Sequence, residues 1–183
     1  MVRFSIQCFY GIVKEFLEMN VKKIVMSALL AALTCVATMV IKIPSPLNGY
    51  INLGDCVVLA AGWMLSPAYA FLAAGLGSAL ADLLSGYALY APATFLIKGL
   101  MALVAFYGIN LLQKKIGRLP SKIISGTVAE AVMILGYLAF EGFLYGFIPS
   151  LANVPANGVQ GVAGLIVGIV LVKIFEKAKI SLD

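Results

Sequence analysis

Residues 68–112 read AYAFLAAGLGSALADLLSGYALYAPATFLIKGLMALVAFYGINLL. Two long apolar runs, Ala68 to Leu84 and Ala91 to Leu112, stand on either side of a short break at Ser85 and Gly86. Serine and glycine at such a position end helices at little cost. A run of roughly 20 mostly apolar residues crosses a lipid bilayer as a helix. This stretch therefore predicts two membrane-spanning helices joined by a short loop.

The same test finds four more spans in the rest of the chain. The six predicted spans are Ile24 to Ile41, Leu53 to Leu65, Ala68 to Leu84, Ala91 to Leu112, Ile123 to Tyr145, and Val159 to Phe175. We expect a loop at Arg118, Pro120 and Ser121 between the fourth and fifth spans, and another at Pro149, Asn153, Pro155, Asn157 and Gly158 before the sixth. The chain is 62% hydrophobic and 11% charged, with a mean hydropathy of +1.04, whereas soluble domains are roughly 45–50% apolar and about 25% charged. We therefore expect an all-α fold, a six-helix transmembrane bundle. Its divisions are an N-terminal cytoplasmic or interfacial segment (1–22), a six-span membrane domain (23–177) and a cytoplasmic tail (178–183).

The positions of lysine and arginine predict the orientation of the bundle. Basic residues near span ends stay in the cytoplasm, and here they gather before the first span, between the fourth and fifth, and after the sixth. They are Arg3, Lys14, Lys22, Lys23, Lys114, Lys115, Arg118, Lys122, Lys173, Lys177 and Lys179. We therefore predict a multi-pass protein of the cell membrane with both termini cytoplasmic. This topology accounts for the net charge of +5 without a nucleic-acid partner.

Five ionisable side chains fall within or at the ends of the predicted spans. They are Asp55, Asp82, Lys98, Glu130 and Glu141. Charge at membrane depth is costly, so each is a candidate functional group. All except Glu130 are expected in the outer half of the membrane. For Glu130 we expect a structural hydrogen bond.

The loops on the outer side add hydrogen-bonding and aromatic side chains to this group. They are Asn48, Tyr50, Asn52, Tyr87, Tyr90 and Thr94. Together with Asp55, Asp82, Lys98 and Glu141, they predict a pocket for a small polar, aromatic ligand. A structural reading stays open: the two aspartates end helices at the interface, Lys98 pairs with one of them, and the tyrosines form an interfacial belt.

Small residues recur at four-residue spacing, which lets membrane helices approach closely. Ala28 and Ala32, with Ser27 and Ala31 beside them, give the first span a flat face. That face serves either packing within the bundle or docking of another membrane protein. The pairs Gly75 and Ala79, Gly77 and Ala81, and Gly164 and Gly168 are expected to pack inside the bundle.

Several kinds of chemistry find no support in the sequence. The chain contains no histidine and no GxxxxGK[ST], HExxH or GxSxG motif, so the usual general base and the phosphate loop of ATPases are missing. Cys8, Cys35 and Cys56 are read as small hydrophobic residues. We expect neither catalysis nor a bound cofactor or metal. A self-sufficient ion-coupled carrier or channel is the main alternative to a binding protein, and a membrane enzyme is the third.

Two segments carry a resemblance to a known family. The runs GYINLGDCVVLAAGWML (49–65) and GLGSALADLLSGYALYAPATFLIKGLMALVA (75–105) resemble the substrate-binding S components of energy-coupling factor (ECF) vitamin transporters. The pieces Asn52 to Asp55 and Ala91 to Thr94 carry most of the specificity. Within the family, the chain looks most like the riboflavin-type branch, whose members are also assigned pyridoxine or hydroxymethylpyrimidine.

The resemblance implies a membrane subunit that captures a B vitamin or its precursor from outside. In this family the subunit then associates with a transmembrane coupling subunit and two cytoplasmic ATPases. An Ala-x-x-x-Ala face on the first helix meets the coupling subunit, which corresponds here to Ala28 and Ala32. The connection between the first two helices gates the pocket, which corresponds to residues 42–53. We prefer pyridoxine or hydroxymethylpyrimidine over riboflavin, since no large apolar platform for a three-ring flavin is evident.

Overall fold

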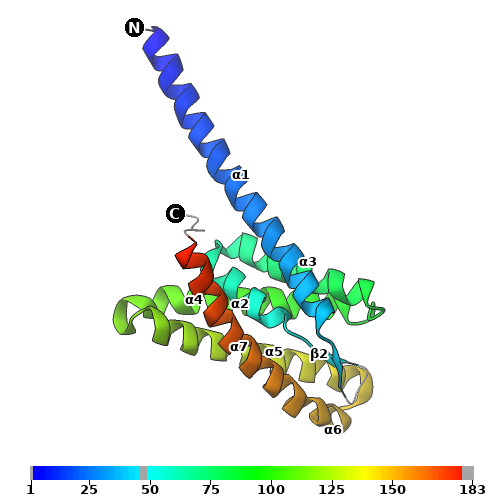
Figure 1. Cartoon of the computed structure of the whole chain (residues 1–183). Coiled ribbons are helices and arrows are strands. Elements are labelled where there is room, and N and C mark those ends of the chain that lie inside the picture. The colour runs from blue at the N-terminus through cyan, green and yellow to red at the C-terminus, as the bar shows by residue number, and fades with distance from the viewer. Residues whose placement is uncertain (1, 46–48, 179–183) are drawn as a thin grey trace.

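The structure, a computed structural model, describes the backbone of residues 2–45 and 49–178 and the side chains of residues 21–45 and 49–178. Its elements in chain order are α1 (Val2–Val40), β1 (Ile43–Pro44), β2 (Tyr50–Ile51), α2 (Gly54–Met64), α3 (Pro67–Leu84), α4 (Ala91–Ile116), α5 (Arg118–Tyr145), α6 (Phe147–Ser150), the 3-10 turn η1 (Leu151–Asn153) and α7 (Val154–Lys177). The helices form one bundle (Figure 1). The predicted spans correspond to α1, α2, α3, α4, α5 and α7, which confirms the six-helix all-α fold.

Lipid-facing surface surrounds this bundle. Within the described residues, five helical segments are long and apolar enough to cross a membrane. They expose large apolar side chains outward, among them Leu111 at 71% and Val162 at 61% exposure. Such a surface is stable against lipid tails and would aggregate in water. α1 continues from its span toward the N-terminus as one helix of 39 residues.

The remaining predicted span, α2, is too short to be among these five helices. It is short because it lies at the centre of the bundle. Residues 54–62 are all buried, and α1, α3, α4 and α7 all pack against α2. A Cβ on Gly62 would lie 2.6 Å from the carbonyl oxygen of Ala102, so α2 and α4 touch backbone to backbone. Because its neighbours cover both of its ends, 11 residues suffice for this helix.

Two of the predicted small-residue pairs mark close helix contacts. A Cβ on Gly77 of α3 would lie 2.4 Å from the carbonyl oxygen of Ala31 in α1. On α7, a Cβ on Gly164 would lie 2.7 Å from Cβ of Asp55, and one on Gly168 would lie 3.0 Å from the carbonyl oxygen of Cys56. These contacts confirm the expected packing role of the glycines, since each position has room for a hydrogen atom only.

Two predicted loops are wrong. α4 and α5 are separated by Gly117 alone, whose φ of 83° suits glycine. Pro120 and the residues beside it, which we expected in a loop, lie in the first turn of α5. Likewise, α7 begins at Val154, with Pro155 in its first turn. A proline there costs nothing, because the first helical N–H groups have no partner within the helix.

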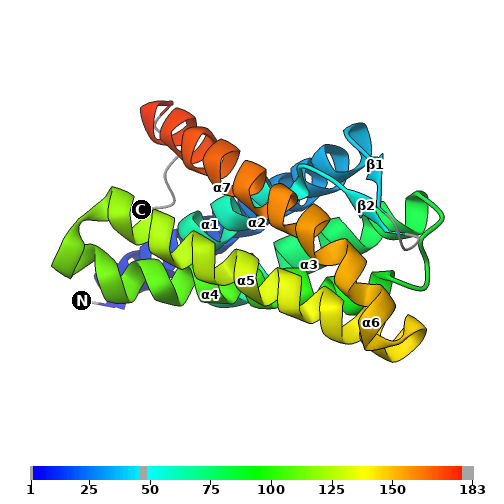
Figure 2. The same cartoon turned by 90° about the horizontal axis from the view of Figure 1, so that it is seen from below.

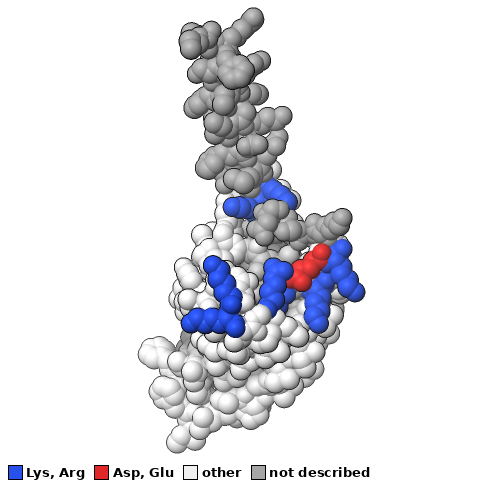
Figure 3. Space-filling view, turned by 90° about the vertical axis from the view of Figure 1, so that its left-hand side faces the viewer, with Lys and Arg blue, Asp and Glu red and all other residues white. Residues whose placement is uncertain are grey.

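The two ends of the bundle differ in chemistry. Figure 2 shows the α4–α5 turn and the end of α7 at the left, and the β1–β2 hairpin and α6 at the right. Figure 3 views the first of these ends, on which lysine and arginine side chains gather. This agrees with the predicted cytoplasmic side. The hairpin, in which Ile43 pairs with Ile51, therefore lies at the outer end, between α1 and α2.

Candidate ligand-binding site

A polar pocket lies at the outer end of the bundle, where the hairpin, the α3–α4 turn, α5 and α7 meet. Its lining residues are Ser45, Gly49, Tyr50, Asn52, Asp82, Tyr87, Tyr90, Thr94, Tyr137, Glu141, Asn157 and Gln160. Seven predicted site residues are among them: Tyr50, Asn52, Asp82, Tyr87, Tyr90, Thr94 and Glu141. Asp55 and Lys98 do not line the pocket, and Asn48 lies outside the described residues.

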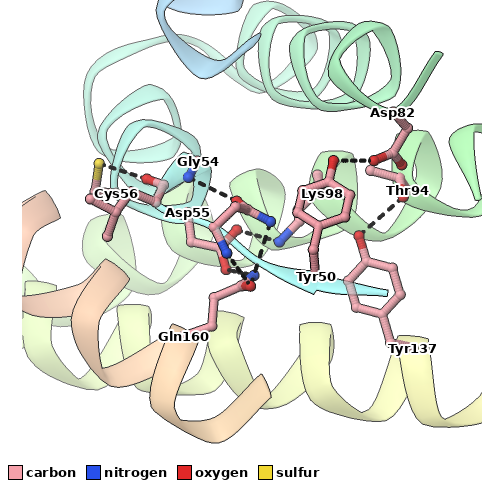
Figure 4. Close-up of polar contacts among 11 residues, drawn as sticks. Tyr50, Gly54, Asp55, Cys56, Asp82, Thr94, Lys98, Tyr137 and Gln160 are labelled. Atoms are coloured by element: carbon pink, nitrogen blue, oxygen red, sulfur yellow. Dashed lines mark hydrogen bonds and ion pairs between the residues drawn. The ribbon is translucent and has the colours of Figure 1, made fainter. Parts of the chain in front are cut away.

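Asp82, in the last turn of α3, forms one wall of the pocket. The hydroxyl of Tyr50 donates a hydrogen bond of 2.5 Å to its Oδ1 atom. Burial, followed by this bond, raises the pKa of Tyr50, so the hydroxyl stays protonated and remains a donor. The Oδ2 atom is buried and accepts no hydrogen bond within the described part of the chain. Beside Asp82 (Figure 4), the hydroxyls of Thr94 and Tyr137 lie 3.1 Å apart.

Glu141 of α5 forms the second acidic wall. Its Oε1 atom accepts a hydrogen bond of 2.8 Å from the Asn153 amide and a longer one of 3.5 Å from the Tyr90 hydroxyl. Its Oε2 atom is buried and makes no hydrogen bond with the described residues. The side chain is only 3% exposed. A buried carboxylate oxygen without a donor is costly, so both acidic walls offer an acceptor to a ligand that carries N–H or O–H groups.

A buried polar network supports the pocket from below. Lys98 of α4 forms an ion pair with Asp55 of α2, and both side chains are almost completely buried. Gln160 of α7 donates a 2.7 Å hydrogen bond to Asp55 Oδ2 and accepts one of 2.9 Å from the backbone N–H of Asn52. The Asn52 side chain in turn accepts from the Gly54 N–H at 2.9 Å. Figure 4 shows these contacts at the left, and the Asp82 and Tyr137 side of the site at the right.

This network changes the expected place of two residues. Asp55 and Lys98 were predicted to lie in the pocket, but neither lines it. Asp55 bonds the lining residue Gln160, and the Lys98 ammonium lies 5.5 Å from the ring centroid of the lining residue Tyr137. The structural reading, in which Lys98 pairs with an aspartate, agrees with the observed ion pair between Lys98 and Asp55. The pair fixes Gln160 and Asn52, which are themselves pocket residues.

Glu130 differs from its prediction. Both of its carboxylate oxygens are buried and make no hydrogen bond with the described residues, so the expected structural hydrogen bond is wrong. The side chain packs against the glycines of α7: a Cβ on Gly161 would lie 3.1 Å from Cβ of Glu130. A Cβ on Gly164 would lie 3.1 Å from Glu130 Oε1 and 2.7 Å from Asp55 Cβ, which places Glu130 close to the central network.

Aromatic rings cover the pocket on its outer side. Tyr50 and Tyr87 have ring centroids 4.7 Å apart, and Tyr87 contacts Tyr90 at 6.5 Å. The Lys42 ammonium lies 5.7 Å from the centroid of the Tyr50 ring and donates a hydrogen bond to Ser85. These contacts tie the hairpin to the α3–α4 turn. The free space beneath them is about 30 Å³, room for about two water molecules, so a ring-sized ligand requires this cover to move.

Sequence reasoning missed five lining residues: Ser45, Gly49, Tyr137, Asn157 and Gln160. Two of them carry a signal in the sequence that could have found them. Tyr137 precedes Glu141 by four residues and therefore shares its helix face. Gln160 is an uncharged polar residue inside an apolar span, which intramembrane polarity alone marks as a candidate.

The four predicted interface residues divide between two sides of α1. Ala28 and Ala32 are exposed, next to the exposed side chains of Leu29 and Val36. Ser27 and Ala31 are partly buried, and the Ala31 carbonyl meets Gly77 as described above. Only the Ala28 and Ala32 side is therefore available to a partner.

Comparison with known proteins agrees with this arrangement. The family described as "ECF-type riboflavin transporter, S component" matches residues 18–177. The chain is 36% identical to an uncharacterised protein in the gap 3′ region of Pyrococcus woesei, over 73% of this chain and 87% of that protein. It is 25% identical to the thiamine precursor transporter HmpT of Lactococcus lactis subsp. cremoris (strain MG1363), over 88% of this chain and 92% of that one.

Solved structures share the fold. The S component of a bacterial ECF transporter superposes with a TM-score of 0.69 at 24% identity, covering 86% of this chain and 97% of that chain. The biotin S component of an ECF-type ABC transporter gives 0.62 at 18% identity, with 87% and 93% covered. With the family match over nearly the whole span region, these findings show that the chain belongs to the S components of ECF-type transporters, the vitamin-binding membrane subunits described as riboflavin-type.

Proposed function

We propose that this chain captures hydroxymethylpyrimidine or pyridoxine from outside the cell and presents it for ATP-driven uptake. Riboflavin is the less favoured ligand. A transmembrane coupling subunit and two cytoplasmic ATPases would supply the energy, and the complex would lie in the cell membrane of a prokaryote. The observation that carries the proposal is the pair of buried carboxylates, Asp82 and Glu141. Both line one aromatic pocket, and each has an oxygen that accepts no hydrogen bond from the described residues.

This pair favours a ligand rich in hydrogen-bond donors. Hydroxymethylpyrimidine carries a ring amino group and a hydroxymethyl group, and pyridoxine carries three hydroxyls. Either can donate to two separate carboxylates while its ring stacks on tyrosine. The relative HmpT is described as a thiamine precursor transporter, which supports the pyrimidine choice.

The same walls disfavour a phosphorylated vitamin. None of the described lining residues is a lysine or arginine, and Lys98 is already paired with Asp55. A phosphate next to two buried carboxylates would be repelled without compensation. We therefore expect the pocket to bind the free vitamin in preference to its phosphate ester.

Calorimetry on the purified protein tests the proposal. We expect tight binding of hydroxymethylpyrimidine or pyridoxine, at least tenfold weaker binding of riboflavin, and no binding of the phosphate esters. Asp82→Asn and Glu141→Gln remove one acidic wall each and should each weaken binding. Glu176→Gln, in the last turn of α7 and outside the pocket lining, is the charge-matched control. Failure of every B vitamin and precursor to bind would refute the proposed function.

A further inference from the structure

A second and larger cavity lies at the cytoplasmic end of the bundle. Its volume is about 290 Å³, and it is bounded by α1, the α2–α3 junction, α4 and the start of α5. Five polar side chains line it: Lys23, Ser66, Asn110, Gln113 and Arg118. The proposed vitamin site at the outer end shares none of these residues.

Among the described side chains, positive charge exceeds negative charge at this cavity. None of its described lining residues is acidic, and Lys23 makes no ion pair with any side chain that the structure describes. Arg118 lies 3.6 Å from Glu176, but that carboxylate is closer to Lys122, at 2.9 Å. Two cations on different helices therefore face a shared space in which an anion would be stabilised.

The neighbouring walls have the chemistry of a membrane interface. Trp63 donates a hydrogen bond of 3.0 Å from its indole N–H to Ser125 Oγ, which fixes the ring as a rigid wall. Tyr69 is the second interfacial aromatic residue of the lining, and Met64 and Leu65 supply apolar surface. Tryptophan and tyrosine are enriched at the level of the lipid headgroups.

Lipid-facing side chains lie next to the cationic wall. Ile24, which follows Lys23, is 53% exposed, and Leu111, which follows Asn110, is 71% exposed. A ligand whose phosphate enters the cavity can therefore lay an apolar chain along the bundle surface. A free anion would gain nothing from these side chains, whereas a lipid gains burial of its acyl chain.

We infer that this cavity binds the phosphate headgroup of an anionic phospholipid from the cytoplasmic leaflet. Lys23 and Arg118 hold the phosphate, while Asn110 and Gln113 are placed to bond the headgroup and glycerol oxygens. Basic pockets between membrane helices on the cytoplasmic side favour such headgroups. The lipid bridges α1 to the packed pair of helices α4 and α5 across this cavity.

Reconstitution of the full chain into vesicles tests the inference. One set contains phosphatidylcholine alone and the other phosphatidylcholine with one part in five of phosphatidylglycerol. We expect the wild-type protein to melt several degrees higher in the second set and to retain phosphatidylglycerol in native mass spectrometry. Lys23→Gln with Arg118→Gln should abolish both effects. Lys114→Gln with Lys115→Gln removes the same charge from exposed positions outside the cavity and should preserve them.

Each contrary result would overturn the inference. If the wild-type protein melts at the same temperature in both vesicle sets, no lipid site exists. If Lys114→Gln with Lys115→Gln loses the rise in melting temperature to the same extent, the rise depends on general surface charge and not on this cavity. If millimolar inorganic phosphate in pure phosphatidylcholine reproduces the shift, the cavity takes a free anion. The charge-conserving pair Lys23→Arg with Arg118→Lys serves as the folding control: it should keep the shift, and loss of the shift there would also count against the inference.

Discussion

Asp55 and Lys98 depend on each other because both are withdrawn from solvent. Removing one partner of a buried ion pair leaves the other charge uncompensated, which costs several kcal/mol. The sequence identified both as candidate functional residues, because they are ionisable side chains within predicted membrane spans. The sequence could not tell that they lie behind the pocket, because this depends on how α2, α4 and α7 converge on Gln160.

The pair yields a prediction that separates support from direct ligand contact. Lys98→Met should lower the stability by about 3–5 kcal/mol and weaken vitamin binding as a consequence. The double variant Lys98→Met with Asp55→Asn removes both charges and should recover most of both losses. Thermal unfolding and calorimetry on the same preparations measure this. If stability returns but binding does not, the charges themselves touch the ligand and our placement is wrong.

Tyr50 gives a second residue-scale prediction. Tyr50→Phe keeps the ring that covers the pocket but removes the hydroxyl bonded to Asp82. A hydrogen bond to a charged group contributes about 1.5–3 kcal/mol, so ligand affinity should fall roughly tenfold or more if the bond orients Asp82 for binding. Tyr107→Phe, at an exposed position on α4, is the matched control. Unchanged affinity in Tyr50→Phe would remove Tyr50 from the site.

At the scale of elements, the predicted helices are right because a bilayer imposes a minimum apolar length. Their ends were less predictable, since proline and glycine serve both as loop residues and as first-turn or turn residues. Pro120 and Pro155 were assigned to loops, yet each lies in a first helical turn. The β1–β2 hairpin was not foreseen either, because strands of two residues have no periodicity to read.

α7 offers a test of helix packing with an internal control. Gly164→Ala places a methyl group 2.7 Å from Asp55 Cβ, and such overpacking costs about 1–3 kcal/mol. Gly158→Ala on the same helix meets nothing within 4 Å and should be neutral or stabilise by roughly 0.5–1 kcal/mol. Thermal unfolding in one detergent compares the two variants. Equal effects would show that α7 does not approach α2 as closely as described.

The exposed face of α1 leads to a prediction about transport. Ala32→Leu should leave ligand binding intact but reduce vitamin uptake by cells, because a bulky side chain prevents close approach of a partner helix. Ala131→Leu makes the same change at an exposed position on α5 and should leave uptake unchanged. Loss of binding in Ala32→Leu would instead assign this face to the fold of the bundle.

At the scale of the whole molecule, charge and pocket lie at opposite ends, and this polarity gives the protein a direction. The basic end is cytoplasmic by the distribution of lysine and arginine, so the acidic pocket faces outward and can collect a ligand before any partner acts. This orientation stays a prediction, which can be made from the sequence because charge placement is a property of the chain. It could not predict how far the aromatic cover closes the pocket, since that depends on contacts between the hairpin and the α3–α4 turn.

Cysteine labelling of intact cells tests this direction. Leu89→Cys and Ile148→Cys lie at the outer end and are well exposed, at 60% and 85% in the native residues, so a membrane-impermeant maleimide should label both. Ala178→Cys, at the exposed end of α7, should react only after the cells are opened. The unmodified chain supplies the background from its native cysteines. Labelling of Ala178→Cys in sealed cells, with protection of the other two, would invert the protein in the membrane and place the acidic pocket where no external vitamin could reach it.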